Sequence, residues 1–551
     1  MKKLFLATLL VAAFIIPNLS SVYACTNILV SRGASSDGSA MIAYSADAGG
    51  FMERLYFYRG GKHNPGETVD IYEWDTGKFL GKIKQAAETY NVVGNMNDYQ
   101  VSVGETTFGG RSELIDTNAL VDYGSLMQLA LQRAKTAREA IKVMTSLVAE
   151  YGYYSSGESF SVADPNEVWI MEMISKGPKE RGAVWVARRV PDGYIAAHAN
   201  MARIREFPLN DPDNCLYAPD VISFAEKAGY YDKKKDGAFS FVNAYCPPDP
   251  GGLLFCESRV WSIFRRAAAS QNFSDDYFRA VKGADPYPLF VKPDAKLSVR
   301  DMIGLMRDHF EGTPFDMTKG VAAGEYGNPY RWKPLEFKIG DDTANVYGWE
   351  RPISTQQTAY SFVSQMRSDL PREIGGIMWY GVDDTYGTVY MPFYCSMSQA
   401  PRSYVVGAIN DFTMESAWWI FNLVNNLSYH KYSYVIKDIQ AVQKEFEDKF
   451  FAYQPALENA AKELYKQDPK LAASFLSDYS VAQAEGVAQR WRELWRDLVM
   501  KYNDGYINDV NREAGRHPKS SGYGDELFKR AVSERPGYYD VRWREKNEGK
   551  K

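Results

Sequence analysis

The alternation of apolar and polar positions near the start of the chain predicts a β-hairpin. Residues 27–30 and 41–44 have the pattern of strands, and Asp37-Gly38 between them is a typical turn pair. The pattern recurs further along and predicts a second hairpin, formed by residues 90–97 and 100–107. The chain is therefore expected to begin with antiparallel sheet.

A helix and a further group of strands follow. Between Ser125 and Val148 apolar residues recur at helical spacing, which predicts one helix that packs on the sheet. Short apolar runs between turn residues then predict strands at 160–163, 168–172, 184–187, 194–196, 374–379 and 388–390. Strands, a helical layer and more strands indicate an α+β layered fold, and not the regular alternation of a doubly wound sheet.

From residue 434 the sequence becomes charged, rich in alanine and helical. The helices predicted in this region cover residues 441–451, 457–465 and 482–500. Charge-rich helices of this kind are more often solvent-exposed faces than partner sites. We divide the chain into a leader (1–24), a catalytic domain (25–433) and a helical C-terminal region (434–551).

The first 24 residues have the features of a secretory signal peptide. Lys2 and Lys3 give a positive start, residues 4–16 are apolar, and Ala24 is the small residue that a signal peptidase needs. The apolar run is short for a bilayer, and no later segment is long and apolar enough, so no membrane span is expected. The protein is predicted to be exported, to the periplasm or the cell exterior, with Cys25 as its mature N-terminus.

A cysteine at the N-terminus carries both parts of a nucleophilic device. The thiol is the nucleophile, and the α-amine, with a pKa of about 7.7 to 8.0, can accept the thiol's proton near neutral pH. Two other interpretations of Cys25 stay open, namely the lipid-modified cysteine of a membrane-anchored lipoprotein and an ordinary structural cysteine. A lipoprotein usually continues with a polar tether, whereas Asn27 to Val30 is strand-like. Asp47, just past the second strand, could accept hydrogen bonds from the α-amine or could cap a turn.

Composition narrows the functional classes. The chain has 551 residues, with 64 basic and 69 acidic side chains, and its formal net charge of −5 gives no indication of nucleic-acid binding. The five histidines are not spaced as metal ligands, and nucleotide-binding, zinc-peptidase and serine-hydrolase motifs are absent. We therefore expect no metal and no cofactor.

Cysteine and histidine leave two further possibilities. A papain-like couple of Cys25 with His198 is possible, although the longer local motif of papain-like enzymes is missing. In an exported protein the other cysteines can oxidise, and proximity favours a pairing of Cys246 with Cys256. The four cysteines besides Cys25 are Cys215, Cys246, Cys256 and Cys395.

Several short stretches are informative when they are taken in order. They are residues 25–30 with Asp37-Gly38-Ser39, residues 94–101 with 104–107, residues 197–200, and later blocks at 257–261, 328–332, 353–358 and 501–506. Together they resemble peptidase family C69, dipeptidases with an N-terminal cysteine nucleophile, which are related more distantly to choloylglycine hydrolases and penicillin V acylase. The resemblance implies the four-layer αββα N-terminal nucleophile hydrolase fold.

The resemblance also implies catalytic residues. Cys25 is the nucleophile, Asp47 matches the aspartate that holds the nucleophile's amine, and Asn200 matches an oxyanion asparagine. Arg259 matches an active-site arginine of the acylase relatives.

Three further residues are expected to bind substrate. Asn97 and Thr107 should line the pocket, with Thr107 near a second oxyanion group. Tyr44 stands where the acylase relatives have an arginine. A neutral phenol cannot supply the same field to a thiolate, so either another cation serves or activation rests more on the α-amine.

The function implied by the resemblance is that of a secreted cysteine dipeptidase. It would hydrolyse dipeptides or short peptides through a thioester acyl-enzyme on Cys25. A rival enzyme class is an amidase or acylase that uses the same centre on N-acylated small molecules. A rival of another kind is a lipoprotein that binds peptides without cleaving them. A small peptide is the only partner expected, and the sequence indicates neither side-chain preference nor oligomeric state.

Overall fold

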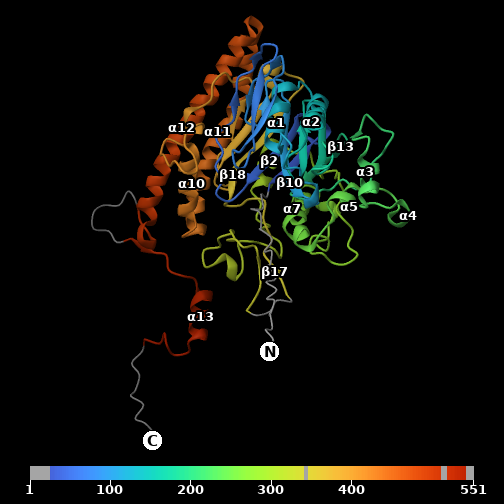
Figure 1. Cartoon of the computed structure of the whole chain (residues 1–551). Coiled ribbons are helices and arrows are strands. Elements are labelled where there is room, and N and C mark those ends of the chain that lie inside the picture. Colours follow the sequence, from blue (N-terminus) through green and yellow to red (C-terminus); the bar gives the residue numbers. More distant parts are fainter. Residues whose placement is uncertain (1–24, 341–344, 510–517, 542–551) are drawn as a thin grey trace, which may run out of the picture.

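Two antiparallel β-sheets lie face to face at the centre of the protein, and helices cover their outer faces (Figure 1). The structure is a computed structural model, and it describes residues 25–340, 345–509 and 518–541. The predicted leader, residues 1–24, lies outside the described residues. The expected α+β class, with helices layered on antiparallel sheet, is confirmed.

The first sheet has six strands. Its spatial order is β14 (Ile195–His198), β1 (Thr26–Val30), β2 (Ala40–Asp47), β18 (Thr358–Met366), β19 (Ile377–Val382) and β20 (Met391–Tyr394). The predicted first hairpin is confirmed, because β1 pairs antiparallel with β2 and Thr26 lies opposite Ser45. Cys25 directly precedes β1, so this register places it beside the end of β2, where Asp47 is the last residue.

The second sheet has eight strands. Its order is β15 (Cys215–Tyr217), β13 (Ala183–Arg189), β12 (Val168–Ser175), β11 (Gly157–Ala163), β10 (Ser102–Gly109), β9 (Met96–Asn97), β8 (Val92–Val93) and β3 (Phe57–Tyr58). The predicted second hairpin is interrupted, because residues 90–97 form two short strands with a turn at Gly94. Gly94 has a φ of +54°, and a Cβ there would lie 2.3 Å from the Met378 side chain, so the turn needs glycine.

Two helices cover the second sheet where the spacing predicted one. They are α1 (Tyr123–Arg133) and α2 (Ala137–Tyr151). Thr136 separates them, and its side chain accepts a hydrogen bond from the backbone N–H of Glu139 and so caps α2. Hydrophobic spacing continues across the break, which is why periodicity alone missed it.

Short elements connect the layers on one side of the molecule. The longer helices among them are α3 (Val221–Ala228), α5 (Phe241–Tyr245), α7 (Ser258–Ala267) and α8 (Val299–Met306). Two predicted strands shift: residues 372–375 form the short helix α9 before β19, and β20 begins just after the predicted 388–390.

Three helices cover the first sheet, namely α10 (Ala417–Ser428), α11 (Tyr432–Gln467) and α12 (Pro469–Tyr502). The sequence predicted a gap in α11 around Pro455, but the helix continues through it. One side of the pair is core, since Phe451 stacks on Trp379 of β19 and Trp491 stacks on Phe421. A shorter helix, α13 (Asp525–Glu534), follows further along the chain (Figure 1).

The edge of the first sheet is covered by α12. β20 is the outermost strand and contains Pro392. The Ser480 hydroxyl of α12 donates a hydrogen bond to the carbonyl oxygen of Pro392, with an O–O distance of 2.8 Å. The helix therefore lies against the side of the sheet that no further strand occupies.

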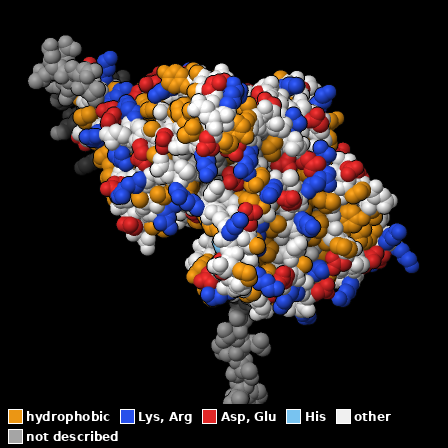
Figure 2. Space-filling model, turned by 90° about the horizontal axis from the view of Figure 1, so that it is seen from above, with side chains coloured by type: hydrophobic (Ala, Val, Ile, Leu, Met, Phe, Trp, Pro, Cys, Tyr) orange, Lys and Arg blue, Asp and Glu red, His pale blue; other side chains and the backbone are white. Residues whose placement is uncertain are grey.

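Charges of both signs are mixed over the surface seen in Figure 2. Among the described residues no helix is both long and apolar enough to cross a membrane. The five cysteines are buried free thiols, so the expected Cys246–Cys256 disulfide is not formed. Cys246 instead donates to the Phe108 carbonyl and Cys256 to the Asn200 carbonyl.

Candidate active site

Cys25 lines a cavity where β1 begins and β2 ends. The side chain is buried, with 4% of its surface exposed. The walls come from β2, β10, β18, the start of α1 and two loops. Its lining residues are Cys25, Tyr44, Ala46, Asp47, Ala48, Phe51, Trp74, Asp75, Glu105, Tyr123, Met127 and Tyr360. Of the five cysteines, Cys25 alone is among them.

The thiol of Cys25 touches two polar side chains. It donates a hydrogen bond to Glu105 Oε1 at 3.4 Å, and the Tyr44 hydroxyl lies 3.7 Å from Sγ. The same hydroxyl donates to Glu105 Oε1 at 2.7 Å. Burial raises the pKa of the Cys25 thiol well above its usual value, and the negative charges of Glu105 and Asp47 raise it further. The isolated site therefore holds the thiol and not the thiolate.

The Asn27 side chain of β1 holds the backbone of Glu105 beside the thiol. Cys25 and Asn27 are two residues apart and so point to the same side of the strand. The Asn27 side-chain amide donates to the Glu105 carbonyl oxygen at 2.6 Å. Neighbouring Gly104 permits this approach, because a Cβ there would lie 2.5 Å from Asn27 Oδ1.

Two more carboxyl groups accompany Glu105, and we call these three residues the carboxyl cluster. Glu158 of β11 hydrogen-bonds to Glu105, and burial together with the Glu105 charge raises the pKa of Glu158 well above its usual range. Burial also raises the pKa of Glu105, but less than that of Glu158, so Glu158 is the first of the pair to hold a proton. Asp75 accepts a hydrogen bond from the Tyr123 hydroxyl at 2.7 Å, and burial raises the pKa of Asp75 to about 7.

Asp47 is held differently from the carboxyl cluster. Its carboxylate is fully buried and accepts hydrogen bonds from the Ser45 and Thr358 hydroxyls. It also forms an ion pair with Arg351, with an N–O distance of 2.7 Å. The backbone N–H of Asp47 hydrogen-bonds to the sulfur of Cys25, which lowers the thiol pKa. Asp47 therefore lies at the site, where its backbone contacts the sulfur of Cys25 and its carboxylate is held by Arg351 and two hydroxyl groups.

Arg259 of α7 joins Cys25 to Asn200. One guanidinium nitrogen donates to the Cys25 carbonyl oxygen at 2.6 Å, and another donates to Asn200 Oδ1 at 3.0 Å. Asn200 follows β14 and has a φ of +60°, a conformation that asparagine tolerates better than most residues. Its Nδ2 donates to the Thr107 carbonyl oxygen at 2.8 Å. The buried arginine thus orients both the backbone of Cys25 and the side-chain amide of Asn200.

The predicted substrate-binding residues are placed in different ways. Tyr44 lines the cavity and contacts the thiol. Thr107 borders the carboxyl cluster, where its hydroxyl donates to Glu158 Oε1 at 2.7 Å. Asn97 is buried, with its side chain hydrogen-bonded to backbone groups of β9–β10 and to Leu131 and Ala134. Neither Asn97 nor Thr107 is among the residues that line the cavity, contrary to the prediction from the sequence.

His198 does not couple to Cys25. Its two ring nitrogens hydrogen-bond to the Thr106 and Ser161 hydroxyls, at 2.7 and 2.8 Å, between the two sheets. Burial, with a smaller effect of Arg203, lowers the pKa of His198 to about 3, so the ring is neutral at physiological pH. The geometry gives no support to a papain-like couple.

Comparison with known proteins identifies the family. The model of peptidase family C69 matches residues 24–445. The chain belongs to this family.

Named relatives agree with the assignment. The probable dipeptidase B of Streptococcus pyogenes serotype M1 is 24% identical over 90% of this chain and 97% of its own length. The probable dipeptidase of Salmonella dublin is 27% identical over 69% of this chain and 82% of its own length. Dipeptidase A of Lactobacillus helveticus is 24% identical over 73% of this chain and 81% of its own length. The C69 similarity therefore extends over most of the chain.

Sequence reasoning missed three residues of this C69 site. Glu105 stood inside a stretch that carried the resemblance, but it looked like one polar residue in a strand. Asp75 lies in a loop with no motif, and Arg351 is 304 positions from its partner Asp47. Only the carboxylate within an otherwise buried strand was a local signal.

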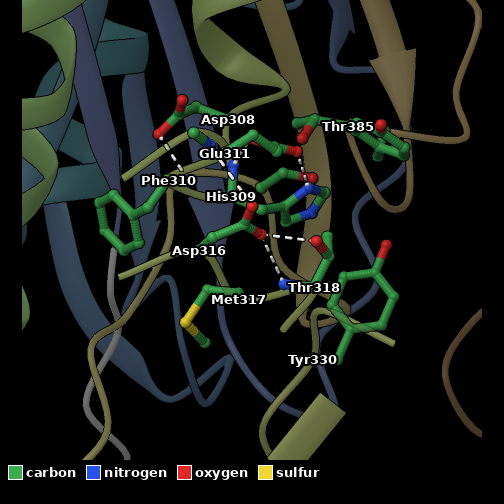
Figure 3. Close-up of polar contacts among 12 residues, drawn as sticks. Asp308, His309, Phe310, Glu311, Asp316, Met317, Thr318, Tyr330 and Thr385 are labelled. Carbon is green, nitrogen blue, oxygen red and sulfur yellow. Dashed lines mark hydrogen bonds and ion pairs between the residues drawn. The ribbon is translucent and has the colours of Figure 1, made fainter. Parts of the chain in front are cut away.

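A second polar cluster in the C69 chain surrounds His309 (Figure 3). His309 Nδ1 lies 3.0 Å from Glu311, and Asp308 accepts from the backbone N–H of Phe310. The backbone N–H of Ser354 donates to the Asp308 carbonyl oxygen at 3.1 Å. The cluster thus supports the segment that carries Arg351.

Proposed function

We propose that this chain is a cysteine dipeptidase that uses Cys25, as the N-terminal residue of the mature protein, to hydrolyse dipeptides or short peptides. The observation that carries the proposal is that Cys25, and no other cysteine, lines the cavity at the start of β1. Family membership and the names of the relatives support the peptidase class. The layer order of helices, two antiparallel sheets and helices suits an N-terminal nucleophile hydrolase.

The proposal includes export. The signal-peptide pattern of residues 1–24 predicts cleavage after Ala24, which would give Cys25 a free α-amine. Burial and nearby charge keep the thiol protonated, so the site needs a base close to the sulfur. The α-amine of the same residue is such a base, and we assign Asp47, which lines the same cavity, to orient it.

The reaction proceeds in two stages. The α-amine takes the thiol proton, the sulfur attacks the peptide carbonyl carbon, and the amine then protonates the departing nitrogen as the carbon–nitrogen bond breaks. The thioester that remains is hydrolysed by water, which frees the acid and returns the proton to sulfur. Asn200 Nδ2 and the backbone N–H of Asp47 are the donors proposed for the oxyanion.

A glycine placed before Cys25 tests the role of the α-amine. The extension turns the amine into an amide that accepts no proton at neutral pH, so the protein should fold and be inactive. The measurement is dipeptide hydrolysis by authentic and extended proteins, with mass spectrometry to confirm the N-terminus. Equal turnover by the two proteins would sink the N-terminal nucleophile mechanism.

Asn200→Ala tests the oxyanion site. Loss of one such donor typically costs about 2.7 to 4 kcal/mol of transition-state stabilisation, so kcat should fall about 100- to 1,000-fold. Wild-type kcat in a folded variant would remove Asn200 from the mechanism.

A further inference from the structure

The cavity at Cys25 is lined by carboxyl groups and by no cationic side chain. Among the lining carboxyl groups Asp47 is paired, to Arg351. The pKa values of Glu105 and Asp75 are shifted by burial, by neighbouring acidic groups and by uncharged hydrogen-bond donors. No basic side chain is among the main causes of either shift. A buried charge is costly unless it is paired. The acidic lining of the cavity should therefore favour binding of a positively charged group of a ligand.

Of the acidic groups that line the cavity, Glu105 is the one hydrogen-bonded to the Cys25 thiol. It is 2% exposed, and its Oε1 lies 3.4 Å from the sulfur of Cys25. Among the described residues, its other side-chain partners are the Tyr44 hydroxyl and the Glu158 carboxyl group. Asn27 holds the Glu105 backbone in place. The carboxylate is thus rigidly placed beside the nucleophile.

Building on the function proposed above, we propose that Glu105, assisted by Asp75, binds the free α-ammonium group of the substrate. The enzyme then acts on peptides with an unmodified N-terminus and rejects N-acylated ones. This specificity separates a dipeptidase from an acylase with the same nucleophile.

The dimensions of a dipeptide fit this assignment. Its α-nitrogen is one carbon from the carbonyl carbon, at about 2.5 Å by standard bond lengths. A carbonyl poised for attack lies about 3 to 3.5 Å from the sulfur. The ammonium therefore falls within about 6 Å of Sγ, where a carboxylate in contact with the thiol can accept its hydrogen bond. An acylated nitrogen has no charge to offer and adds a group in the same space.

Bound ammonium also changes the nucleophile. The Glu105 charge is one of the groups that keep the thiol protonated. A substrate ammonium neutralises that charge and replaces the thiol as hydrogen-bond donor to Oε1. The substrate itself thereby makes the thiol proton easier to transfer to the α-amine of Cys25, and an N-acylated peptide does not.

The test compares a free dipeptide with its N-acetylated form in the mature wild-type enzyme and in Glu105→Gln. Wild type should prefer the free dipeptide in kcat/KM. In Glu105→Gln, kcat/KM for the free dipeptide should fall about 10- to 100-fold, as expected for a lost hydrogen bond between charged groups, while that for the acetylated peptide stays constant or rises. Thermal melting checks the fold of the variant.

Two further variants keep the test decisive. Glu158→Gln replaces the protonated carboxyl group with an amide donor and leaves the charge on Glu105, so the preference for the free dipeptide should persist. If Glu105→Gln fails to fold, Glu105→Asp takes its place in the test. This variant keeps the negative charge on a shorter side chain, so it should retain part of the preference for the free dipeptide. Asp75→Asn should weaken the preference less than Glu105→Gln.

The outcomes separate this inference from the dipeptidase proposal. Equal wild-type activity on both peptides, or an equal loss on both in Glu105→Gln, would overturn the ammonium subsite and leave the dipeptidase proposal standing. An equal loss would mean that Glu105 acts on the thiol or on the Cys25 amine. Hydrolysis of neither peptide by the wild-type enzyme would overturn both.

Discussion

Buried carboxylates in this protein occur in two contrasting regions. Where α11 packs on the first sheet, Glu447 and Glu458 each form a two-pronged ion pair, with Arg307 and Arg367 respectively. At the cavity, the carboxyl cluster faces the nucleophile without a basic partner among the described residues. The first arrangement neutralises charge within the fold. The second leaves acidic groups beside Cys25 without a basic side chain, so that a cationic ligand can pair with them, and this arrangement favours binding at the expense of stability.

The largest effect should come from breaking a pair in the helical region. Arg367→Met leaves Glu458 as a buried, unpaired charge, which should lower the free energy of unfolding by about 3 to 5 kcal/mol. Denaturant unfolding measures this loss. Arg402→Met is the matched control, because the Arg402–Glu415 pair is exposed and should contribute less than about 1 kcal/mol. Similar losses in the two variants would contradict the assigned difference.

Substitution of Asp47, the carboxylate of the cavity that is paired with Arg351, should lower both stability and turnover. Asp47→Asn weakens its ion pair with Arg351, so stability should fall by about 1.5 to 3 kcal/mol, the range for hydrogen bonds to charged groups. Turnover should also fall, because the carboxylate no longer orients the α-amine. Unfolding and dipeptide hydrolysis are measured on one preparation. Unchanged stability would show that Arg351 does not depend on Asp47, and unchanged turnover would remove Asp47 from the reaction.

The unpaired cluster should show the opposite sign of stability effect. A carboxyl group whose folded pKa is raised contributes stability below its unfolded pKa, about 4.3 for Glu, and loses it as the pH rises through the folded pKa. Each unit of elevation corresponds to about 1.4 kcal/mol. Glu158→Gln removes this loss, so the variant should gain stability relative to wild type at pH 8 compared with pH 4.5.

Exposed Glu463, which pairs with Lys466 on the surface, provides the control for that pH dependence. Glu463→Gln should shift the unfolding curve little at either pH. A Glu158→Gln variant that is no more favoured at pH 8 than at pH 4.5 would show that the cluster does not store unfavourable charge.

The smallest effect concerns reagents that differ only in charge. Neutral iodoacetamide should alkylate Cys25 several-fold faster than anionic iodoacetate, because the Glu105 charge lies beside the sulfur. The ratio of the two rate constants should decrease in Glu105→Gln. A ratio that is the same in both proteins would mean that this charge is not felt at the thiol.

Local signals predicted much of this molecule. The Cys25 strand, its hairpin partner and most strands of the second sheet followed from alternation and turn pairs. The errors arose where tertiary contacts decided the outcome. Apolar spacing concealed the break at Thr136, and packing carried α11 through Pro455.

The site divides in the same way. Cys25, Asp47, Asn200 and Arg259 followed from the order of short motifs, and the structure brings these four residues together. Arg351 could not be predicted because it meets Asp47 only through the folded sheet. The raised pKa values of Glu105 and Glu158 depend on cross-strand neighbours that a linear sequence does not reveal.

The packing of α12 on β20 affects the tendency of the chain to aggregate before it is fully folded. An uncovered edge strand offers its backbone to strands of other molecules and so promotes aggregation. Pro392 already removes one backbone donor from this edge, and Ser480 of α12 occupies the proline's carbonyl oxygen. Because α12 comes later in the chain than β20, the edge stays open until α12 has been synthesised. We therefore expect α12 to protect this edge against self-association, and truncation before α12 should give an aggregating protein.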